Sequence, residues 1–352
     1  MLHTAFVWSS ACKFAICWSL IVAQAAHGAA IHSAPPNSWP AAVAHAARLN
    51  PDARIVVLDI ASGRLLAAAH LSESARTLAA PGSTLKPLLL YSLVASHRWD
   101  PDRRIACSRR LRIGDRSLDC SHPPLPAPPN ATDALTWSCN TYFAALAASI
   151  PPAQLRPLLA TTGLLAQTGL APPNSGEATA LFRDPTTASA VQLTALGVEG
   201  IQVTPLELAA AYRWLALQLI NHPDFAAAQP AAAQVVLTGL ADSASFGIAG
   251  QASLGGVPVA GKTGTANLGP GTPSHGWFVG FAPAFRPTAT APTGQTPAQS
   301  ASESSPQPTI VICIYLPSGH GSDAARVAAD VLAHSPLARS APPNSARGHG
   351  QP

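Results

Sequence analysis

Strand-forming segments lie near both ends of this chain, and helix-forming segments fill the part between them. Near the N-terminal end, RIVVLDIASGRLLAAA (54–69) predicts two strands around a turn at Ser62-Gly63. Towards the other end, three successive segments predict strands: VPVAGKTGTA (257–266), GWFVGFAPA (276–284) and TIVICIYLP (309–317). We therefore predict an α/β (α+β) fold: one antiparallel sheet built from both chain ends and flanked by helices, with a helical subdomain inserted.

Three segments between or after these strands have helical patterns. DALTWSCNTYFAALAASI (133–150) predicts a helix with a break near Ser138. VTPLELAAAYRWLALQLI (203–220) is the clearest helix, with Pro205 in its first turn. SDAARVAADVLAHS (322–335) predicts a closing helix.

The chain of 352 residues divides into one predicted domain and its flanking segments. Residues 1–25 predict a signal peptide or an uncleaved anchor, because Lys13 precedes the apolar run FAICWSLIV (14–22) and the small-residue pattern Ala23-Gln24-Ala25. We therefore expect an exported protein, in the periplasm or on the outer face of the cytoplasmic membrane. Residues 26–44 predict a Pro/Ser-rich tether, 45–335 the domain with a low-complexity loop at 286–308, and 336–352 a disordered tail.

Charge and cysteine content limit the partners and cofactors. The formal net charge is only +4, and its densest patch, Arg103–Arg116, predicts a solvated hairpin, so we expect no nucleic-acid partner. Cys107 and Cys120 can form a disulfide in an oxidising compartment, and Cys139 is predicted to be a buried apolar filler. No CxxC or HxxxH spacing supports zinc, so no metal is expected, and His32, His122 and His275 are predicted to be solvated or capping residues.

Lysine is rare in this chain: only Lys13, Lys86 and Lys262 occur. The stretch APGSTLKPLLLY (80–91) places Ser83 three residues before Lys86. Since Pro87 lacks an N–H, it fits only in the first turn of a helix, which predicts a helix start near Ser83 and puts the serine and lysine on one face. An ammonium near a helix N-terminus is disfavoured, and a neutral amine beside a hydroxyl can act as its general base.

Two further short motifs can complete such a site. A non-helical link at Ser138-Cys139-Asn140 can aim the serine hydroxyl and the asparagine amide into one cleft. Lys262-Thr263-Gly264-Thr265 predicts an edge strand beside a ligand, where glycine permits close backbone approach. A free N–H of this strand and the N–H of Ser83 can form an oxyanion hole.

The order S-x-x-K, S-x-N and K-T-G resembles the signature of penicillin-binding proteins and serine β-lactamases. The segments RIVVLDIASGRLLAAA, PGSTLKP, ALTWSCNTYFAALA, GIQVTPLELAAAY and AGKTGTA…HGWFVGFAPA look like the transpeptidase domain of high-molecular-weight penicillin-binding proteins. The resemblance runs from about residue 45 to 335 and implies the β-lactamase/transpeptidase-like fold. It also implies peptidoglycan stem peptides and β-lactam antibiotics as ligands, cell-wall synthesis proteins as further candidate partners, and no cofactor.

By this resemblance, Ser83 attacks a D-Ala-D-Ala stem peptide, Lys86 takes the serine proton, and Ser138, with Lys262 nearby, passes a proton to the leaving amine. The resemblance further implies that Asn140 positions the acyl amide. The residues implied to bind the substrate are Thr263, Gly264 and Thr265, with the two threonines on its carboxylate.

The departures from the family pattern leave alternatives open. Where family members often have GQG before the VTP helix, this chain has GVEG (197–200), which we predict touches no catalytic position. The short stretch after the leader predicts no glycosyltransferase module and no dimerisation domain. Water as the acceptor would give a carboxypeptidase, and deacylation on β-lactams would give a β-lactamase, although Glu177 lacks the context of a deacylating base. A penicillin-binding scaffold or sensor is the non-enzymatic alternative.

Overall fold

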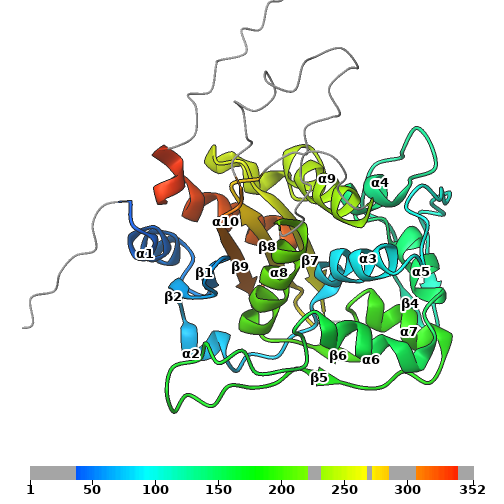
Figure 1. The fold of residues 1–352 in the computed structure, drawn as a ribbon, viewed down its shortest axis with the longest axis horizontal. Helices are drawn as coiled ribbons and strands as arrows, with labels where there is room; N and C mark the ends of the chain where they lie inside the picture. The colour runs from blue at the N-terminus through cyan, green and yellow to red at the C-terminus, as the bar shows by residue number, and fades with distance from the viewer. Residues whose placement is uncertain (1–36, 221–230, 268–271, 285–306, 340–352) are drawn as a thin grey trace, which may run out of the picture. The chain divides into compact units, whose positions relative to one another are not determined.

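Five antiparallel strands form the central sheet of the protein, in the order β2-β1-β9-β8-β7 (Figure 1). They are β1 (Arg54–Asp59), β2 (Leu65–Ala69), β7 (Ala260–Ala266), β8 (His275–Ala282) and β9 (Ile310–Leu316). Cys313 of β9 pairs with Val56 on one side and with Val279 on the other. The N-terminal hairpin and the C-terminal strands therefore join at β1–β9, which confirms the predicted sheet from both chain ends.

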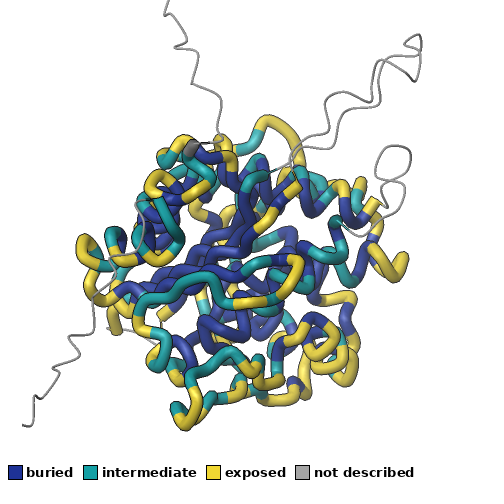
Figure 2. Tube along the Cα trace, turned by 60° about the vertical axis from the view of Figure 1, so that its left-hand side comes forward, coloured by how far each residue is buried: buried dark blue, intermediate teal, exposed yellow. Residues whose placement is uncertain are grey.

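Both faces of this sheet are buried, and alternate residues of one strand enter different cores. Ile55 and Val57 of β1 pack in a cluster with α1 (Trp39–Leu49) and α10 (Gly321–Ala333). Val56 and Leu58 face the other way, into a larger cluster with the inserted helices. This follows from the period of two along a strand, and it explains why β8 and β9 are buried at every position (Figure 2).

The segment between β2 and β7 forms the inserted helical part. Its helices are α2 (Leu71–Ser74), the 3-10 helix η1 (Gly82–Leu85), α3 (Lys86–Ala95), α4 (Ala131–Thr136), α5 (Asn140–Ala148), α6 (Pro152–Thr161), α7 (Ala188–Ala195), α8 (Pro205–Ile220), α9 (Ala231–Ser245) and the 3-10 helix η2 (Gly250–Gly255). Two short hairpins, β3–β4 (Arg112–Ile113, Arg116–Ser117) and β5–β6 (Leu181–Phe182, Ile201–Gln202), lie between them. The first hairpin contains the end of the arginine-rich patch, from Arg112 to Arg116, whereas residues 103–111 of that patch form no strand.

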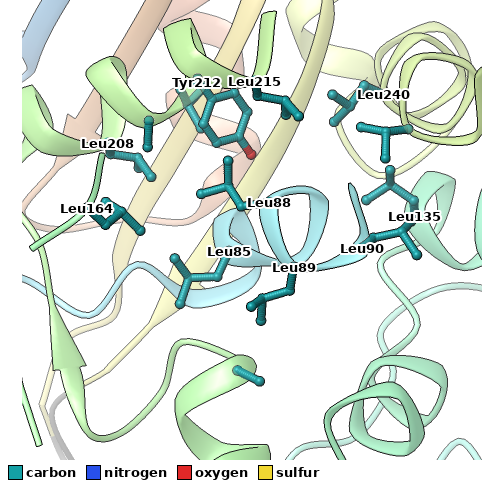
Figure 3. Close-up of a cluster of buried hydrophobic side chains, with 14 of the residues drawn as sticks. Leu85, Leu88, Leu89, Leu90, Leu135, Leu164, Leu208, Tyr212, Leu215 and Leu240 are labelled. Atoms are coloured by element: carbon teal, nitrogen blue, oxygen red, sulfur yellow. The ribbon is translucent and has the colours of Figure 1, made fainter. Parts of the chain in front are cut away.

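Leucines of η1, α3 and α8 form the centre of the larger core. Figure 3 shows Leu85, Leu88 and Leu89 close to Leu208, Tyr212 and Leu215, and all six side chains are buried. The Tyr212 hydroxyl donates a hydrogen bond to the carbonyl of Thr84 at 2.9 Å. The predicted helix at 203–220 thus supports the turn that carries Ser83.

Two predicted flexible segments contain regular structure instead. Residues 26–44 were predicted to be a tether, but α1 begins at Trp39, after a Ser38 cap that accepts from the Ala41 N–H. The apolar residues Ala42, Val43 and Ala46 bury one face of α1, so the tether prediction is wrong from residue 39 onward. The predicted tail likewise begins with the 3-10 helix η3 (Pro336–Arg339), whose Leu337 packs against the core.

The computed structural model describes residues 37–220, 231–267, 272–284 and 307–339. The leader (1–25), most of the loop at 286–308 and the tail from residue 340 lie outside the described residues. Within the described part, no helix combines the length and the apolar character needed to cross a bilayer.

Candidate active site

A cleft of about 430 Å³ brings the three sequence motifs to one place. Of the predicted site residues, Ser83, Asn140 and Thr265 line it directly. The remainder of its wall comes from the β3–β4 hairpin with the residues that follow it, the α7–β6 loop, and the segments beside β7 and β8; these residues are Asp115, Arg116, Ser117, Leu118, Asp119, Leu196, Val198, Ala266, Asn267 and Ser274.

Ser83 lies on the 3-10 turn η1, immediately before α3. We predicted that the helix begins near Ser83, but the α-helix begins at Lys86 and Pro87 occupies its second position. Gly82 has φ +56°, and its N–H donates to the carbonyl of Gly197 at 2.9 Å. A Cβ on Gly197 would lie 2.2 Å from the Gly82 carbonyl oxygen, so only glycine fits there. GVEG, which we predicted touches no catalytic position, therefore contacts the residue directly before Ser83.

Lys86 is fully buried, and its amine meets the second motif. Its Nζ lies 3.2 Å from Ser138 Oγ, 2.9 Å from the Ser138 carbonyl oxygen and 2.6 Å from Asn140 Oδ1. Burial lowers the pKa of Lys86 from 10.5 to about 7, against an opposing effect of Cys139 and Cys120. We predicted a lowered pKa from the helix N-terminus; desolvation is the larger cause. An amine with such a pKa is partly neutral near pH 7 and can accept a proton.

Ser138 and Cys139 of the S-x-N motif lie in a non-helical link between α4 and α5, as predicted, and Asn140 is the first residue of α5. Asn130 caps α4 in a capping box with Asp133, and the helix ends before Ser138, which adopts a left-handed φ of +56°. This turn lets Ser138 and Asn140, two positions apart, both reach the Lys86 amine. The Asn140 amide Nδ2 also donates to the carbonyls of Leu118 and Asp119, at 3.0 and 3.3 Å.

The K-T-G motif lies on β7, at the edge of the sheet, as predicted. Lys262 is fully buried, with Nζ 3.0 Å from the Thr263 carbonyl oxygen. Burial, together with repulsion from Lys86, holds its pKa well below the ordinary value. A Cβ on Gly264 would lie 2.5 Å from the Pro81 carbonyl oxygen, which is why glycine lets the strand pass close to the Ser83 turn. Thr263 is buried and does not line the described cleft, whereas Thr265, two positions on, does.

Two buried aromatic residues near the site were missed by sequence reasoning. His275 Nε2 and Trp277 Nε1 both lie 2.9 Å from the carbonyl oxygen of Ala80, three residues before Ser83. The stretch HGWFVG predicted only a strand, and histidines were expected to be solvated or capping. His275 is instead buried, and burial lowers its pKa. The role of His275 in fixing the Ser83 segment follows only from its contact with Ala80, which is far from it in the sequence.

A family model described as "Penicillin binding protein transpeptidase domain" matches residues 53–311. The chain belongs to this family. It is therefore a penicillin-binding cell-wall enzyme, and domains of this family act on peptidoglycan outside the cytoplasm. A search of curated protein sequences found no match.

Solved structures confirm the fold of this transpeptidase domain. It is similar to a peptidoglycan glycosyltransferase from Burkholderia ambifaria (20% identity, TM-score 0.67, covering 86% of this chain and 95% of that chain). The apo transpeptidase domain of Burkholderia pseudomallei penicillin-binding protein 3 is similar at 20% identity and TM-score 0.67, covering 86% and 93%. Pseudomonas aeruginosa PBP2 in complex with WCK 5153 is similar at 20% identity and TM-score 0.64, covering 84% and 74%.

Proposed function

We propose that this protein is a D,D-transpeptidase that cross-links D-Ala-D-Ala stem peptides of peptidoglycan through an acyl-enzyme on Ser83. The observation that carries this proposal is the buried amine of Lys86, three residues after Ser83, which has a lowered pKa and contacts Ser138 and Asn140 of the S-x-N motif. A base with a pKa near the working pH is suited to activate a serine hydroxyl.

In the first half-reaction, the Ser83 hydroxyl oxygen bonds to the carbonyl carbon of the penultimate D-alanine while Lys86 takes the hydroxyl proton. The carbon–nitrogen bond to the terminal D-alanine then breaks. Ser138, with Lys262 nearby, passes its hydroxyl proton to that nitrogen and takes the proton held by Lys86, whose Nζ lies 3.2 Å from Ser138 Oγ. Lys86 is then neutral again, free D-alanine departs, and an ester on Ser83 remains. Asn140 would position the acyl amide, while Thr263 and Thr265 would bind the substrate carboxylate. Gly264, between these threonines, lets β7 pass close to the Ser83 turn.

In the second half-reaction, an amine of a neighbouring stem peptide attacks the ester carbonyl. The new amide bond is the cross-link, and the Ser83 oxygen regains a proton from the attacking amine. Water in place of the amine would give carboxypeptidase activity. The N–H of Ser83 and an N–H of β7 would stabilise the oxyanion in both steps, and one such donor is worth about 10²–10³ in rate.

The three acidic residues between Asn140 and Gly200 do not favour β-lactamase activity. Glu177 accepts hydrogen bonds from the N–H groups of Thr168 and Gly169, at 2.8 and 2.9 Å, so its carboxylate stabilises the loop between residues 168 and 177. Asp184 pairs with Arg156 at 2.7 Å, and Glu199 lies 3.9 Å from Arg116. None of these three carboxylates lines the described cleft that contains Ser83, Asn140 and Thr265. The two carboxylates that do line it, Asp115 and Asp119, belong to the β3–β4 segment, where Asp119 already accepts hydrogen bonds from the Leu111 N–H and the Ser117 hydroxyl. A long-lived acyl-enzyme with β-lactams is therefore expected.

The direct test uses a stem pentapeptide with and without a second peptide that carries a free amine. We expect release of one D-alanine per cross-linked product, detected by mass spectrometry, and loss of both products in Ser83→Ala. D-alanine release without cross-linking at any amine concentration would leave the carboxypeptidase alternative. No D-alanine release by the folded wild-type protein would contradict the proposed function.

A further inference from the structure

Four potential metal ligands meet on the far side of the S-x-N link. Cys107, Cys120, His122 and Cys139 place their ligand atoms within 4.8 Å of one another, and three of the four residues are buried. Cys107 lies before the β3–β4 hairpin, Cys120 and His122 follow it, and Cys139 is the middle residue of the S-x-N motif. The spacing C-x12-C-x-H-x16-C contains no CxxC, so sequence reasoning predicted no metal here.

Three distances within this cluster are close to the edges of a zinc tetrahedron, and the other pairs of ligand atoms lie within 4.8 Å. The Cys107 and Cys120 sulfurs are 3.4 Å apart, Cys120 and Cys139 are 3.9 Å apart, and Cys107 Sγ lies 3.5 Å from His122 Nε2. With zinc–sulfur bonds of 2.3 Å and a zinc–nitrogen bond of about 2.05 Å, a tetrahedron has edges of about 3.8 Å and about 3.6 Å. Three cysteines and one histidine are also a common ligand set of structural zinc sites.

Hydrogen bonds from neighbouring groups orient the ligand atoms of the cluster. His122 Nδ1 lies 2.7 Å from the carbonyl oxygen of Pro123, an acceptor that puts the ring proton on Nδ1 and leaves the Nε2 lone pair towards Cys107. The N–H of Arg109 donates to Cys107 Sγ at 3.4 Å, and the N–H of Asn140 donates to Cys120 Sγ at 3.2 Å. Hydrogen bonds of both kinds orient ligands and stabilise thiolates around a bound metal.

We propose that Cys107, Cys120, His122 and Cys139 bind one Zn²⁺ ion as a structural site. Each of the three thiols releases one proton to solvent, and the neutral imidazole binds through Nε2, so the complex has a net charge of −1. Binding excludes the Cys107–Cys120 disulfide that the sequence permitted, because both sulfurs are ligands. The structure describes both as free cysteines.

The site has a consequence for the cleft, which rests on the proposed function. Cys139 stands between Ser138 and Asn140, and Asn140 is also bonded to the segment at Leu118–Cys120. An ion held by Cys120 and Cys139 therefore ties the cleft wall formed by the β3–β4 hairpin to the α4–α5 link; Figure 1 shows β4 beside α5. The four ligands are positioning residues for Ser138 and Asn140.

The test begins with metal content, which does not depend on enzyme activity. The full chain, exported into zinc-containing medium and purified without a histidine tag, is examined by elemental analysis and native mass spectrometry. We expect one zinc ion per chain in the wild-type protein. The zinc content should be at least tenfold lower in Cys107→Ala and His122→Ala. Cys313→Ala is the matched control: Cys313 is a buried free cysteine in β9, outside the cluster, and its variant should keep the zinc.

Zinc removal from the wild-type protein covers the case in which a variant does not fold. A strong chelator should lower the melting temperature, and added Zn²⁺ should restore it. If the proposed function holds, the stripped protein should also acylate with benzylpenicillin at least tenfold more slowly, and zinc should restore the rate. If acylation is absent throughout, the zinc stoichiometry still stands on its own.

Three results would overturn the proposal. The first is a Cys107–Cys120 disulfide in non-reducing peptide maps of the exported protein, with no zinc. The second is a reduced, folded protein that takes up no Zn²⁺ on titration. The third is equal zinc content in Cys107→Ala, His122→Ala and Cys313→Ala.

Discussion

Two walls of the cleft each bury one lysine, in different ways. The helical wall is the start of α3 with the α4–α5 link; there Lys86 lies within hydrogen-bond distance of oxygens of Ser138 and Asn140. The strand wall is β7, where Lys262 meets the carbonyl of its own neighbour and glycines let two backbones touch. The helical wall therefore depends on the chemistry of side chains from distant segments, and the strand wall depends on the absence of side-chain volume.

Replacing the lysine of each wall with arginine should separate the two walls, and the largest loss of acylation rate should come from Lys86. Lys86→Arg replaces a base of pKa about 7 with a guanidinium that stays protonated, so we expect acylation by benzylpenicillin to slow by about 10³ or more. Lys262→Arg changes a lysine that the proposed mechanism places near the proton transfer from Ser138 but does not use as the base, and should cost about tenfold. Stopped-flow acylation measures both. Equal losses would mean that Lys86 is not the base.

Added volume should damage the strand wall next. Gly264→Ala places a Cβ where the Pro81 carbonyl oxygen is 2.5 Å away, so either β7 or the Ser83 turn must move. Overpacking of this kind costs about 1–3 kcal/mol of unfolding free energy, and we expect acylation to slow by about 10² because the oxyanion donors shift. Gly250→Ala is the control, because a Cβ on Gly250 would lie 4.0 Å from the Ala244 carbonyl oxygen, an ordinary van der Waals distance. If both variants melt and acylate alike, the strand wall does not depend on close approach.

The strand wall was largely predictable from the sequence, whereas the helical wall was only partly so. The lysine, the glycines and the strand pattern lie within one short segment of the sequence. They predict β7, its position at the sheet edge and the close backbone approach at Gly264. The break at Ser138 was also visible. The depth of Lys86, however, is a tertiary property, and its lowered pKa results from burial rather than from the helix N-terminus.

Contacts between distant segments explain the other differences. Nothing local distinguishes Gly197 or His275, because each acts through one backbone atom of the segment before Ser83. The cysteine–histidine cluster was missed for the same reason: its ligands come from both sides of a hairpin and from a helix link. Helix α1 was hidden by the Pro- and Ser-rich stretch before it, although Ser38 is its cap.

The pH dependence of acylation should distinguish the lysine base from other bases. Since only neutral Lys86 can take the Ser83 proton, the rate should fall about tenfold per pH unit below 7 and level off above it. The same lowered pKa affects stability: between pH 7 and 10.5 the unfolded chain binds more protons at this residue, so the free energy of unfolding gains from rising pH. A rate that is flat from pH 5 to 8 would contradict this assignment.

The smallest effect should come from Glu177, which lies on neither wall. Glu177→Gln weakens the hydrogen bonds to Thr168 and Gly169, so we expect a loss of about 1 kcal/mol in unfolding free energy. The rate of hydrolysis of the penicilloyl-enzyme, followed by mass spectrometry, should change less than about twofold. A residue that only stabilises a loop contributes little to transition-state stabilisation. A much slower hydrolysis in this variant would identify Glu177 as a deacylating base and favour β-lactamase activity.

The most direct test of the account is the intact mass of the exported protein during incubation with benzylpenicillin over hours. We predict a mass gain of one whole drug molecule, mapped to the peptide that contains Ser83, long-lived, and absent in Ser83→Ala. No adduct on the folded protein, or an adduct on another residue, would contradict the claim that the three motifs form one acylating site.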